Sequence, residues 1–182
     1  ALSLVAGILA TALLQGNVVE LHTFEGSSSL AVVYKQQVVV IDADPKGAEQ
    51  AEALGKTQLL YTFGQNKAQQ AATVLQEYTP QAAALHQDTA REISPYLPAK
   101  TQLLDMSAQM NVGGGMTLTA GKGYTLIETD GLRVLKLLDG YAIIETEGQP
   151  AAADLIVDAD GLIHRTDRPE QKGERSLRFR LN

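Results

Sequence analysis

Several aspartates are the residues of this sequence that come closest to forming a reactive cluster. Asp42 and Asp44 follow the apolar run 37–41, and Asp158 follows the apolar run 155–157. Active sites of α/β proteins often lie at the ends of strands, and oxygen ligands suit Mg²⁺ or Ca²⁺. A weak metal site could therefore be built from Asp42, Asp44, Asp139 and Asp158. The commoner role of such aspartates is to form turns and cap helices.

The residue types that dominate zinc and thiol chemistry are scarce. The sequence contains no cysteine, which excludes disulfides, thiolate metal sites and cysteine nucleophiles. A zinc site needs three or four converging ligands, usually with two of them close in sequence. The three histidines (His22, His86 and His164) lie far apart and are expected at strand ends or on the surface. This pattern argues against a zinc-dependent or thiol-dependent hydrolase.

Serine chemistry and phosphate binding find equally little support. The turn Gly26-Ser27-Ser28-Ser29 lacks the G-x-S-x-G elbow that presents a nucleophilic serine. The segment 120–125, AGKGYT, lacks the first glycine and the final hydroxyl of a phosphate-binding loop. The sequence therefore predicts no cofactor.

Charge is distributed unevenly along the chain. Residues 164–180 carry six Arg or Lys against three Asp or Glu, a net charge of +3, so that the rest carries −9 of the overall −6. An acidic body argues against non-specific wrapping of nucleic acid, whereas a basic tail allows a local phosphate contact. Candidates for a DNA contact are Arg175, Arg178 and Arg180. The other interpretation is a solvated surface of mixed charge.

The chain opens with an apolar run from Ala1 to Leu14, and its first charged residue is Glu20. A membrane-spanning helix needs about 20 apolar residues, so this run is too short by itself. Two interpretations stay open. Residues 1–16 form the end of a transmembrane helix of a longer protein, or they form an apolar helix that packs within a soluble domain or on a partner. Residues 17–182 are predicted to form the folded domain.

Strand and helix patterns alternate in the first half, and strand patterns dominate the second. Helical spacing predicts helices over 48–54, over 67–78 after a cap at Asn66, and over 89–96 after a cap at Asp88. Apolar and β-branched runs predict strands over 18–24, 29–34, 37–43, 57–62, 82–86, 101–106, 116–120, 124–129, 132–138, 141–146, 154–159 and 176–181. This order favours an α/β sandwich with mixed sheets over a doubly wound parallel sheet.

Two segments carry a resemblance to a known family. The stretch VVELHTFEGSSSLAVVYKQQVVVIDADP, followed by LLYTFGQNKAQQAA, resembles the opening of a metallo-β-lactamase-fold domain. More narrowly, it is similar to the C-terminal domain of the ComEC family of bacterial DNA-uptake (competence) channel proteins. The likeness covers 17–160 in layout and 18–75 in motif. It implies an αββα sandwich with mixed sheets, which in that family follows the transmembrane helices of an inner-membrane channel.

The metal motif of that family is degenerate here. Its pattern, His-x-His-x-Asp-His, falls on Phe63, Gln65, Lys67 and Ala68. None of these is a metal ligand in that chemistry, and the charge of Lys67 would repel a dication. Asp42 matches a structural aspartate of the family, and Asp139 a later metal-bridging one. The resemblance therefore implies a pseudoenzyme.

Three functional hypotheses follow. The first is a non-catalytic module that is structural or guides DNA, with single-stranded DNA and the membrane channel of its own longer chain as partners. The second is a metal-dependent hydrolase or nuclease with the atypical carboxylate site named above. The third is a stand-alone interaction domain. The first implies association with the bacterial inner membrane, and a chain that is not part of a longer protein would be soluble.

Overall fold

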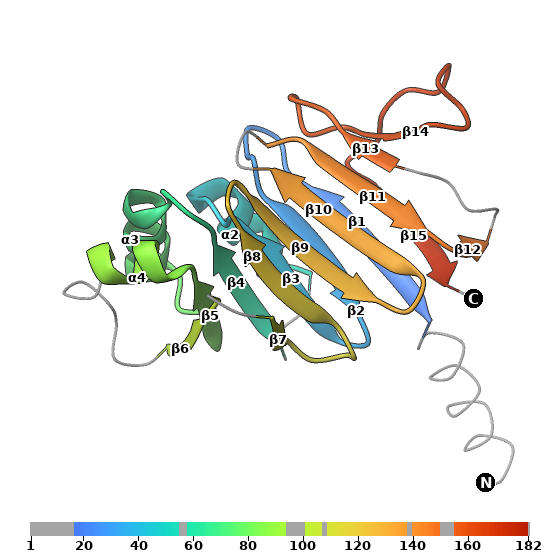
Figure 1. Ribbon diagram of the computed structural model, residues 1–182. Helices are drawn as coiled ribbons and strands as arrows, with labels where there is room; N and C mark the ends of the chain where they lie inside the picture. The colour runs from blue at the N-terminus through green and yellow to red at the C-terminus, as the bar shows by residue number, and fades with distance from the viewer. Residues whose placement is uncertain are drawn as a thin grey trace, which may run out of the picture.

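The computed structural model describes residues 17–54, 58–93, 101–106, 109–137, 140–149 and 155–181. The predictions made for residues 1–16 and for Asp139 lie outside these residues. Figure 1 shows the arrangement of the described helices and strands.

The first half of the chain builds most of one sheet, sheet A. It begins with an antiparallel meander of β1 (Val18–Thr23), β2 (Leu30–Tyr34) and β3 (Gln37–Ile41). Lys35 and Gln36 both have positive φ in the tight turn between β2 and β3, as a two-residue hairpin requires. Parallel strands follow, each reached through a helix: α2 (Pro45–Ala51), β4 (Leu59–Phe63), α3 (Ala68–Glu77), β5 (Ala82–Leu85), α4 (Gln87–Ile93) and β6 (Gln102–Asp105).

The second half builds sheet B and then returns to sheet A. Sheet B is antiparallel and consists of β7 (Met110–Asn111), β8 (Thr117–Gly121), β9 (Tyr124–Thr129), β10 (Leu132–Leu137), β11 (Ala142–Thr146), β13 (Leu155–Val157) and β14 (Ile163–Arg165). Two strands of this half, β12 (Gly148–Gln149) and β15 (Ser176–Leu181), belong to sheet A instead. β15 pairs with β1, and β12 pairs with β15. Both halves of the chain therefore contribute to sheet A.

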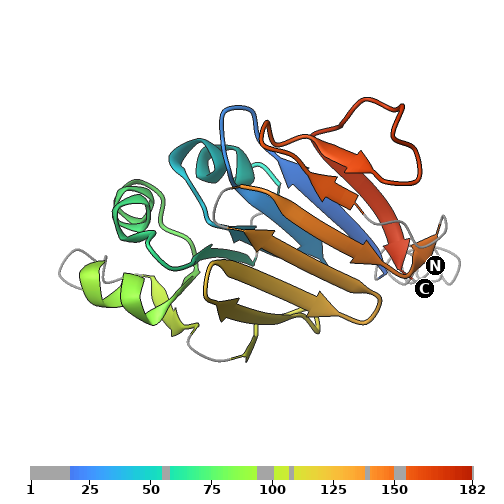
Figure 2. The ribbon, with the colours of Figure 1, turned by 45° about the horizontal axis from the view of Figure 1, so that its top comes forward.

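The helices, sheet A and sheet B form three layers, which Figure 2 shows from a second direction, and two apolar cores lie between them. One core lies between the sheets and joins side chains of sheet A, such as Leu21 and Val39, to side chains of sheet B, such as Ile127 and Val134. The other lies between sheet A and the helices, where Val40 and Tyr61 belong to the same buried cluster as Val74 and Leu75. A mixed α/β architecture with two sheets, as predicted, is confirmed at this level.

The structure also corrects local details. Asn66 does not cap α3 as predicted, because Lys67 occupies the N-cap position and Asn66 lies in the turn before it with φ of 59°. Phe179 on β15 is partly buried and packs against the core between the sheets. None of the helices in the described ranges is long and apolar enough to cross a membrane.

Candidate functional site

One edge of the molecule gathers the ends of strands from both sheets. In sheet A, β1 ends there at Thr23 and β3 at Ile41. In sheet B, β10 and β13 end there, at Leu137 and Val157. Two neighbouring features occupy this edge: a buried ion pair and a surface cavity.

The buried feature is an ion pair between Asp42 and Lys136. The Lys136 Nζ lies 3.1 Å from the Asp42 Oδ2, and the two side chains are 1% and 0% exposed. Asp42 follows β3 with φ of 51°, a left-handed conformation that aspartate tolerates better than most residues. Lys136 lies on the same inward face of β10 as the buried Leu132 and Val134. The pair therefore links sheet A to sheet B.

Every other polar group of Asp42 is also engaged. Its Oδ1 accepts a hydrogen bond from the Gly64 N–H at 3.1 Å, which holds the loop after β4. Its carbonyl accepts from the Ser29 hydroxyl at 3.2 Å and from the Gln70 side chain at 2.9 Å. Its N–H donates to the Thr62 hydroxyl. Both carboxylate oxygens are thus committed to protein partners, and the Asp42 side chain is fully buried.

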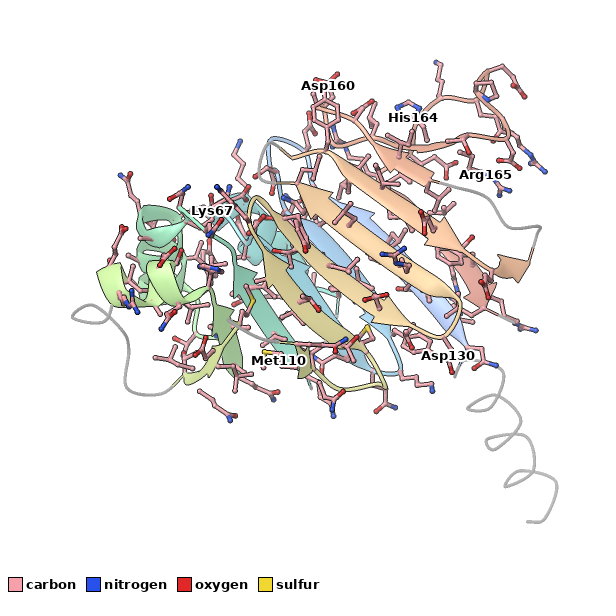
Figure 3. The ribbon with its side chains drawn as sticks, viewed as in Figure 1. Lys67, Met110, Asp130, Asp160, His164 and Arg165 are labelled. Atoms are coloured by element: carbon pink, nitrogen blue, oxygen red, sulfur yellow. The ribbon has the colours of Figure 1, made fainter. Side chains whose placement is uncertain are left out.

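The loop after β4 carries the four positions where the sequence lacks metal ligands. Phe63 is fully buried at the end of β4 and packs with the helices, and Ala68 begins α3 in the same core. The Gln65 Oε1 accepts a hydrogen bond from the Gly123 N–H in the β8–β9 turn. Lys67 lies near the start of α3 (Figure 3). Phe63 and Ala68 therefore belong to the core between sheet A and the helices, and Gln65 ties the loop to sheet B.

The cavity beside the ion pair has a volume of about 510 Å³. It lies between the loop that follows β1 and the turn that follows β13, and it is open to solvent. Its lining combines hydroxyl, carboxylate, guanidinium and backbone groups: Thr23, Gly26, Ser27, Ser28, Ser29, Leu30, Gly140, Val157, Asp158, Ala159, Asp160, Gly161 and Arg175.

The serine loop on one side of the cavity is held by Asp44. The Asp44 carboxylate accepts hydrogen bonds from the Ser27 hydroxyl at 2.7 Å and from the Ser28 N–H at 2.8 Å. It also accepts the Gly47 N–H at 2.7 Å, which makes it the cap of α2. A Cβ at Gly47 would collide with the Ser29 side chain, so the loop and the helix need a glycine there. Asp44 therefore acts as a helix cap and loop anchor.

The turn on the other side of the cavity is organised by Asp158. Its Oδ1 accepts the N–H groups of Asp160 and Leu162, and its Oδ2 lies 2.6 Å from the His164 Nε2. Partial burial opposes ionisation, but the hydrogen bonds from Leu162, His164 and Asp160 outweigh it and lower the pKa of this carboxyl. Ionised Asp158 therefore stabilises the turn at neutral pH, and that contribution is lost as the pH falls through the lowered pKa. Asp160 and His164 are labelled in Figure 3.

Hydrogen bonds of Thr23 and Arg175, which together we call the Thr23 clasp, join the two sheets beside the cavity. The Thr23 hydroxyl donates to the Gly161 carbonyl, and the Thr23 N–H donates to the Arg175 carbonyl at 2.7 Å. The half-buried Arg175 guanidinium donates to the Asp160 carbonyl at 3.3 Å. The arrangement places a cation and several hydroxyls around a solvent-filled space, which suits ligand binding better than acid–base catalysis.

The carboxylates and histidines singled out in the sequence each have a partner of their own and do not converge on one site. Within the described ranges, no three His, Asp or Glu side chains are grouped so that they could hold a metal ion. Asp42, Asp44 and Asp158 are bound to separate partners, as described above. Each histidine lies beside a carboxylate close in sequence: His22 beside Glu20, His86 beside Asp88 and His164 beside Asp158.

The three candidate DNA-contact arginines fall into two places. Arg178 and Arg180 share the exposed face of β15, because they alternate with Leu177, Phe179 and Leu181. Arg178 lies 3.6 Å from Glu20 on the adjacent strand β1. Arg175 precedes the strand and lines the cavity instead. The basic tail is also partly neutralised within itself, because Asp167 accepts two hydrogen bonds of 3.1 Å from Arg165.

Sequence reasoning missed Lys136, although a signal was present. In the strand LRVLKLL the buried positions are Leu132, Val134 and Lys136, so a lysine falls where the alternation demands an apolar residue. A charged residue at an inward position calls for a buried counter-charge. The cavity and the Thr23 clasp have no comparable signal, because they depend on contacts between distant segments.

Neither a scan against models of known protein families nor a search of curated proteins gave a match for this chain.

Proposed function

We propose that this chain is a non-catalytic domain of the metallo-β-lactamase type, from a membrane DNA-uptake protein of the ComEC kind. Its segments 18–45 and 59–72 carry the resemblance, and its two facing sheets with helices on sheet A are compatible with it. The role of the domain is that of a binding or structural module, with single-stranded DNA and the channel portion of its own protein as partners.

The observation that carries this proposal is the ion pair between Asp42 and Lys136. It joins the two sheets at the edge where the strand ends meet, and it uses both oxygens of the carboxylate together with the Gly64 N–H. A buried ammonium group at such a point opposes the binding of a dication by electrostatic repulsion. The ion pair therefore supports a structural role of this edge, and the open cavity beside it supports a binding role.

A role in guiding DNA is supported by the position of the basic residues. Arg175 faces an open cavity with serine hydroxyls around it, and Arg178 and Arg180 lie exposed on the neighbouring strand. Guanidinium groups and hydroxyls are the groups that contact phosphates in protein–DNA interfaces. The negative charge of the residues outside 164–180 opposes phosphate contacts elsewhere on the domain.

The test is a titration of single-stranded DNA by fluorescence anisotropy across a salt series. We expect affinity that falls with salt, and a reduction of the logarithmic salt slope by about 1 for each phosphate-contacting arginine replaced. The variants are Arg175→Ala and the double variant Arg178→Ala/Arg180→Ala. Arg133→Ala is the matched control, because it removes the same charge from sheet B, where Arg133 is paired with Glu128 and Glu145.

Any of three results would overturn the proposal. Absence of binding at low salt, or equal weakening by the Arg133 control, removes the DNA-guiding role. Phosphodiester or lactam hydrolysis that depends on added Zn²⁺ or Mn²⁺ and is lost in Asp158→Asn would instead establish the metal-dependent enzyme.

A further inference from the structure

Strand β6 forms one edge of sheet A. Among the described strands it pairs only with β5, and Figure 1 shows it at the outer margin of the sheet, next to α4. The N–H groups of Gln102 and Met106 donate to the carbonyls of Gln81 and Leu85 on the β5 side. Because backbone groups alternate between the two sides of a strand, the N–H and the carbonyl of Leu103 point away from β5. Within the described ranges, neither group has a hydrogen-bond partner.

The side chain of Leu103 lies at the end of a buried cluster. Leu103 pairs in register with Ala83 on β5, so the two side chains share one face of sheet A. Ala83 and Leu85 belong to the core between that face and the helices. Leu103 itself is 41% exposed, because α4 is the last described helix before the chain continues into sheet B. The edge therefore presents an aliphatic side chain beside an open backbone donor and acceptor.

A surface groove of about 470 Å³ lies beside this edge. It is formed by the end of β5, by α4 and by β6, and its aliphatic lining consists of Leu85, Ala90, Leu103 and Leu104. The groove lies at the carboxyl ends of two parallel strands, which is where ligands commonly bind to open α/β sheets. It is separate from the cavity described above, with which it shares no residue.

Arg91 provides the charge that the groove can offer to a ligand. Its side chain is exposed on α4 and takes part in none of the ion pairs found within the described ranges. The other charged residue of the lining, Asp105, has an interaction of its own. A guanidinium group binds carboxylates through parallel hydrogen bonds. A carboxylate is therefore the ionic group that complements this groove.

These features together fit an extended peptide. A strand that joins the edge of a sheet gains main-chain hydrogen bonds, and pockets for its alternate side chains provide specificity. Here Leu103 offers the main-chain groups, the groove accepts an aliphatic side chain and Arg91 accepts a carboxylate. A free aliphatic acid would leave the backbone groups of Leu103 unused.

A second copy of the chain fits this edge less well. Strand β6 has four residues, so the pairing of two copies would cover a strip of roughly 13 Å by 10 Å. Each partner of a stable protein interface contributes about 800 Å², several times that area. Two copies would also bring together two chains that each have a net charge of −6.

We propose that β6 binds an extended peptide segment of another protein as an additional strand of sheet A. The aliphatic side chain of the peptide packs between Leu103 and α4, and its carboxylate pairs with Arg91. This inference goes beyond the proposed function and does not depend on it.

Amide hydrogen exchange of the full chain, followed by NMR, tests the backbone pairing. The probe is the acetylated and amidated hexapeptide TVTLTE, whose valine, leucine and glutamate share one side of a strand. The Leu103 amide is expected to exchange about tenfold more slowly at about 90% occupancy, because it then exchanges only from the free state. The Gln102 amide, which already donates to Gln81, keeps its rate. An unchanged rate at Leu103 with millimolar peptide would overturn the proposal.

The contribution of Arg91 is measured by the dissociation constant of the same peptide. Arg91→Gln is expected to weaken binding by about two- to fivefold, as the loss of an exposed ion pair predicts. Replacing the glutamate of the peptide by glutamine should have the same effect on the native chain and none on Arg91→Gln. Arg133→Gln, which removes the same charge from sheet B, is the matched control and leaves binding unchanged. Equal weakening by both arginine variants contradicts the assigned carboxylate contact.

The main-chain hydrogen bonds are tested from both partners. Leu103→Pro removes an N–H that does not bond to β5, and proline is tolerated at such edge positions, so binding should be lost while thermal unfolding stays similar. A peptide that is N-methylated at alternate residues keeps its side chains and charge, and it makes the test independent of how the variant folds. We expect one of the two N-methylation patterns to abolish binding. Undiminished binding of both N-methylated peptides rules out strand addition.

Two other occupants give distinct results. Shifts of the β6 amides that depend on protein concentration without peptide would assign the edge to a second copy. Isovalerate that shifts the Leu85 and Ala90 amides as strongly as the peptide does, while Leu103 exchange stays unchanged, would assign the groove to a small acid. Either result contradicts the proposal.

Discussion

At the scale of single residues, the side chains of Asp42 and Lys136 are buried away from water, and this burial determines how they affect the stability of the fold. Removing two charges from solvent is costly, and the cost is offset only when each charge has a partner and its remaining hydrogen-bonding groups are satisfied. Asp42 meets that condition through Lys136 and the Gly64 N–H, and the Lys136 Nζ also donates to the Leu137 carbonyl at 3.4 Å. The pair is therefore sensitive to loss of either member and tolerant of joint neutralisation.

Lys136→Ala is predicted to lower the free energy of unfolding by about 3–5 kcal/mol, because it leaves a buried carboxylate unpaired. Asp42→Asn/Lys136→Met removes both charges, keeps the volume similar and allows the positive φ at position 42. The double variant is expected to be more stable than Lys136→Ala by about 2 kcal/mol or more. Urea denaturation measures both, with Arg133→Ala as the exposed control at about 0–1 kcal/mol. Additive losses in the double variant would show that the two charges do not interact.

Sequence reasoning could locate Asp42 but not its partner. An aspartate that follows a β-branched strand can be recognised in the sequence, because it combines the end of a strand with a turn-forming residue. Lys136 belongs to another sheet, and only the tertiary fold brings its strand to Asp42. The alternation on β10 could have marked Lys136 as buried, but it could not have named the counter-charge.

At the scale of elements, periodicity located most strands and all three described helices. The bounds of α3 were predicted within one residue, as 67–78 against Ala68–Glu77, but its predicted cap was wrong, because Asn66 has positive φ and the helix begins without a side-chain cap. α2 shows the contrasting case: it was predicted over 48–54, three residues too late, although Asp44 as cap and Pro45 in the first turn mark its start at Pro45. The serine loop was read as a turn, but its tie to Asp44 came only with the fold.

Asp44→Ala is predicted to destabilise the fold by about 1–3 kcal/mol, because the cap of α2 and the anchor of the serine loop are lost together. Asp44→Asn should restore a large part of this loss, since asparagine caps helices well. Glu49→Ala removes the same charge from an exposed position of the same helix and should change stability by less than about 0.5 kcal/mol. Thermal and urea unfolding followed by circular dichroism measure all three. Equal effects of the Asp44 and Glu49 substitutions would contradict this role of the cap.

At the scale of the whole molecule, the two halves of the chain depend on each other. The core between the sheets takes side chains from both, and β15 from the C-terminal end pairs with β1 from the N-terminal end. Register pairs such as Val18 with Arg180 join segments at opposite ends of the chain, so local patterns carry no trace of them. The sequence therefore predicted the mixed α/β class, but it did not predict the pairing of β15 with β1 in sheet A.

A fragment that ends after β6, residues 17–106, is therefore predicted not to fold by itself. It would expose the face of sheet A that carries Leu21, Val32 and Val39, and it would leave β1 as an open edge without β15. Exposed apolar strands of this kind associate or stay loosely packed. We expect the fragment to bind a hydrophobic dye and to unfold without a cooperative transition, whereas residues 17–182 unfold in one transition. Cooperative unfolding of the fragment by calorimetry would show instead that sheet A and its helices are stable without sheet B, and that the shared core contributes little to their folding.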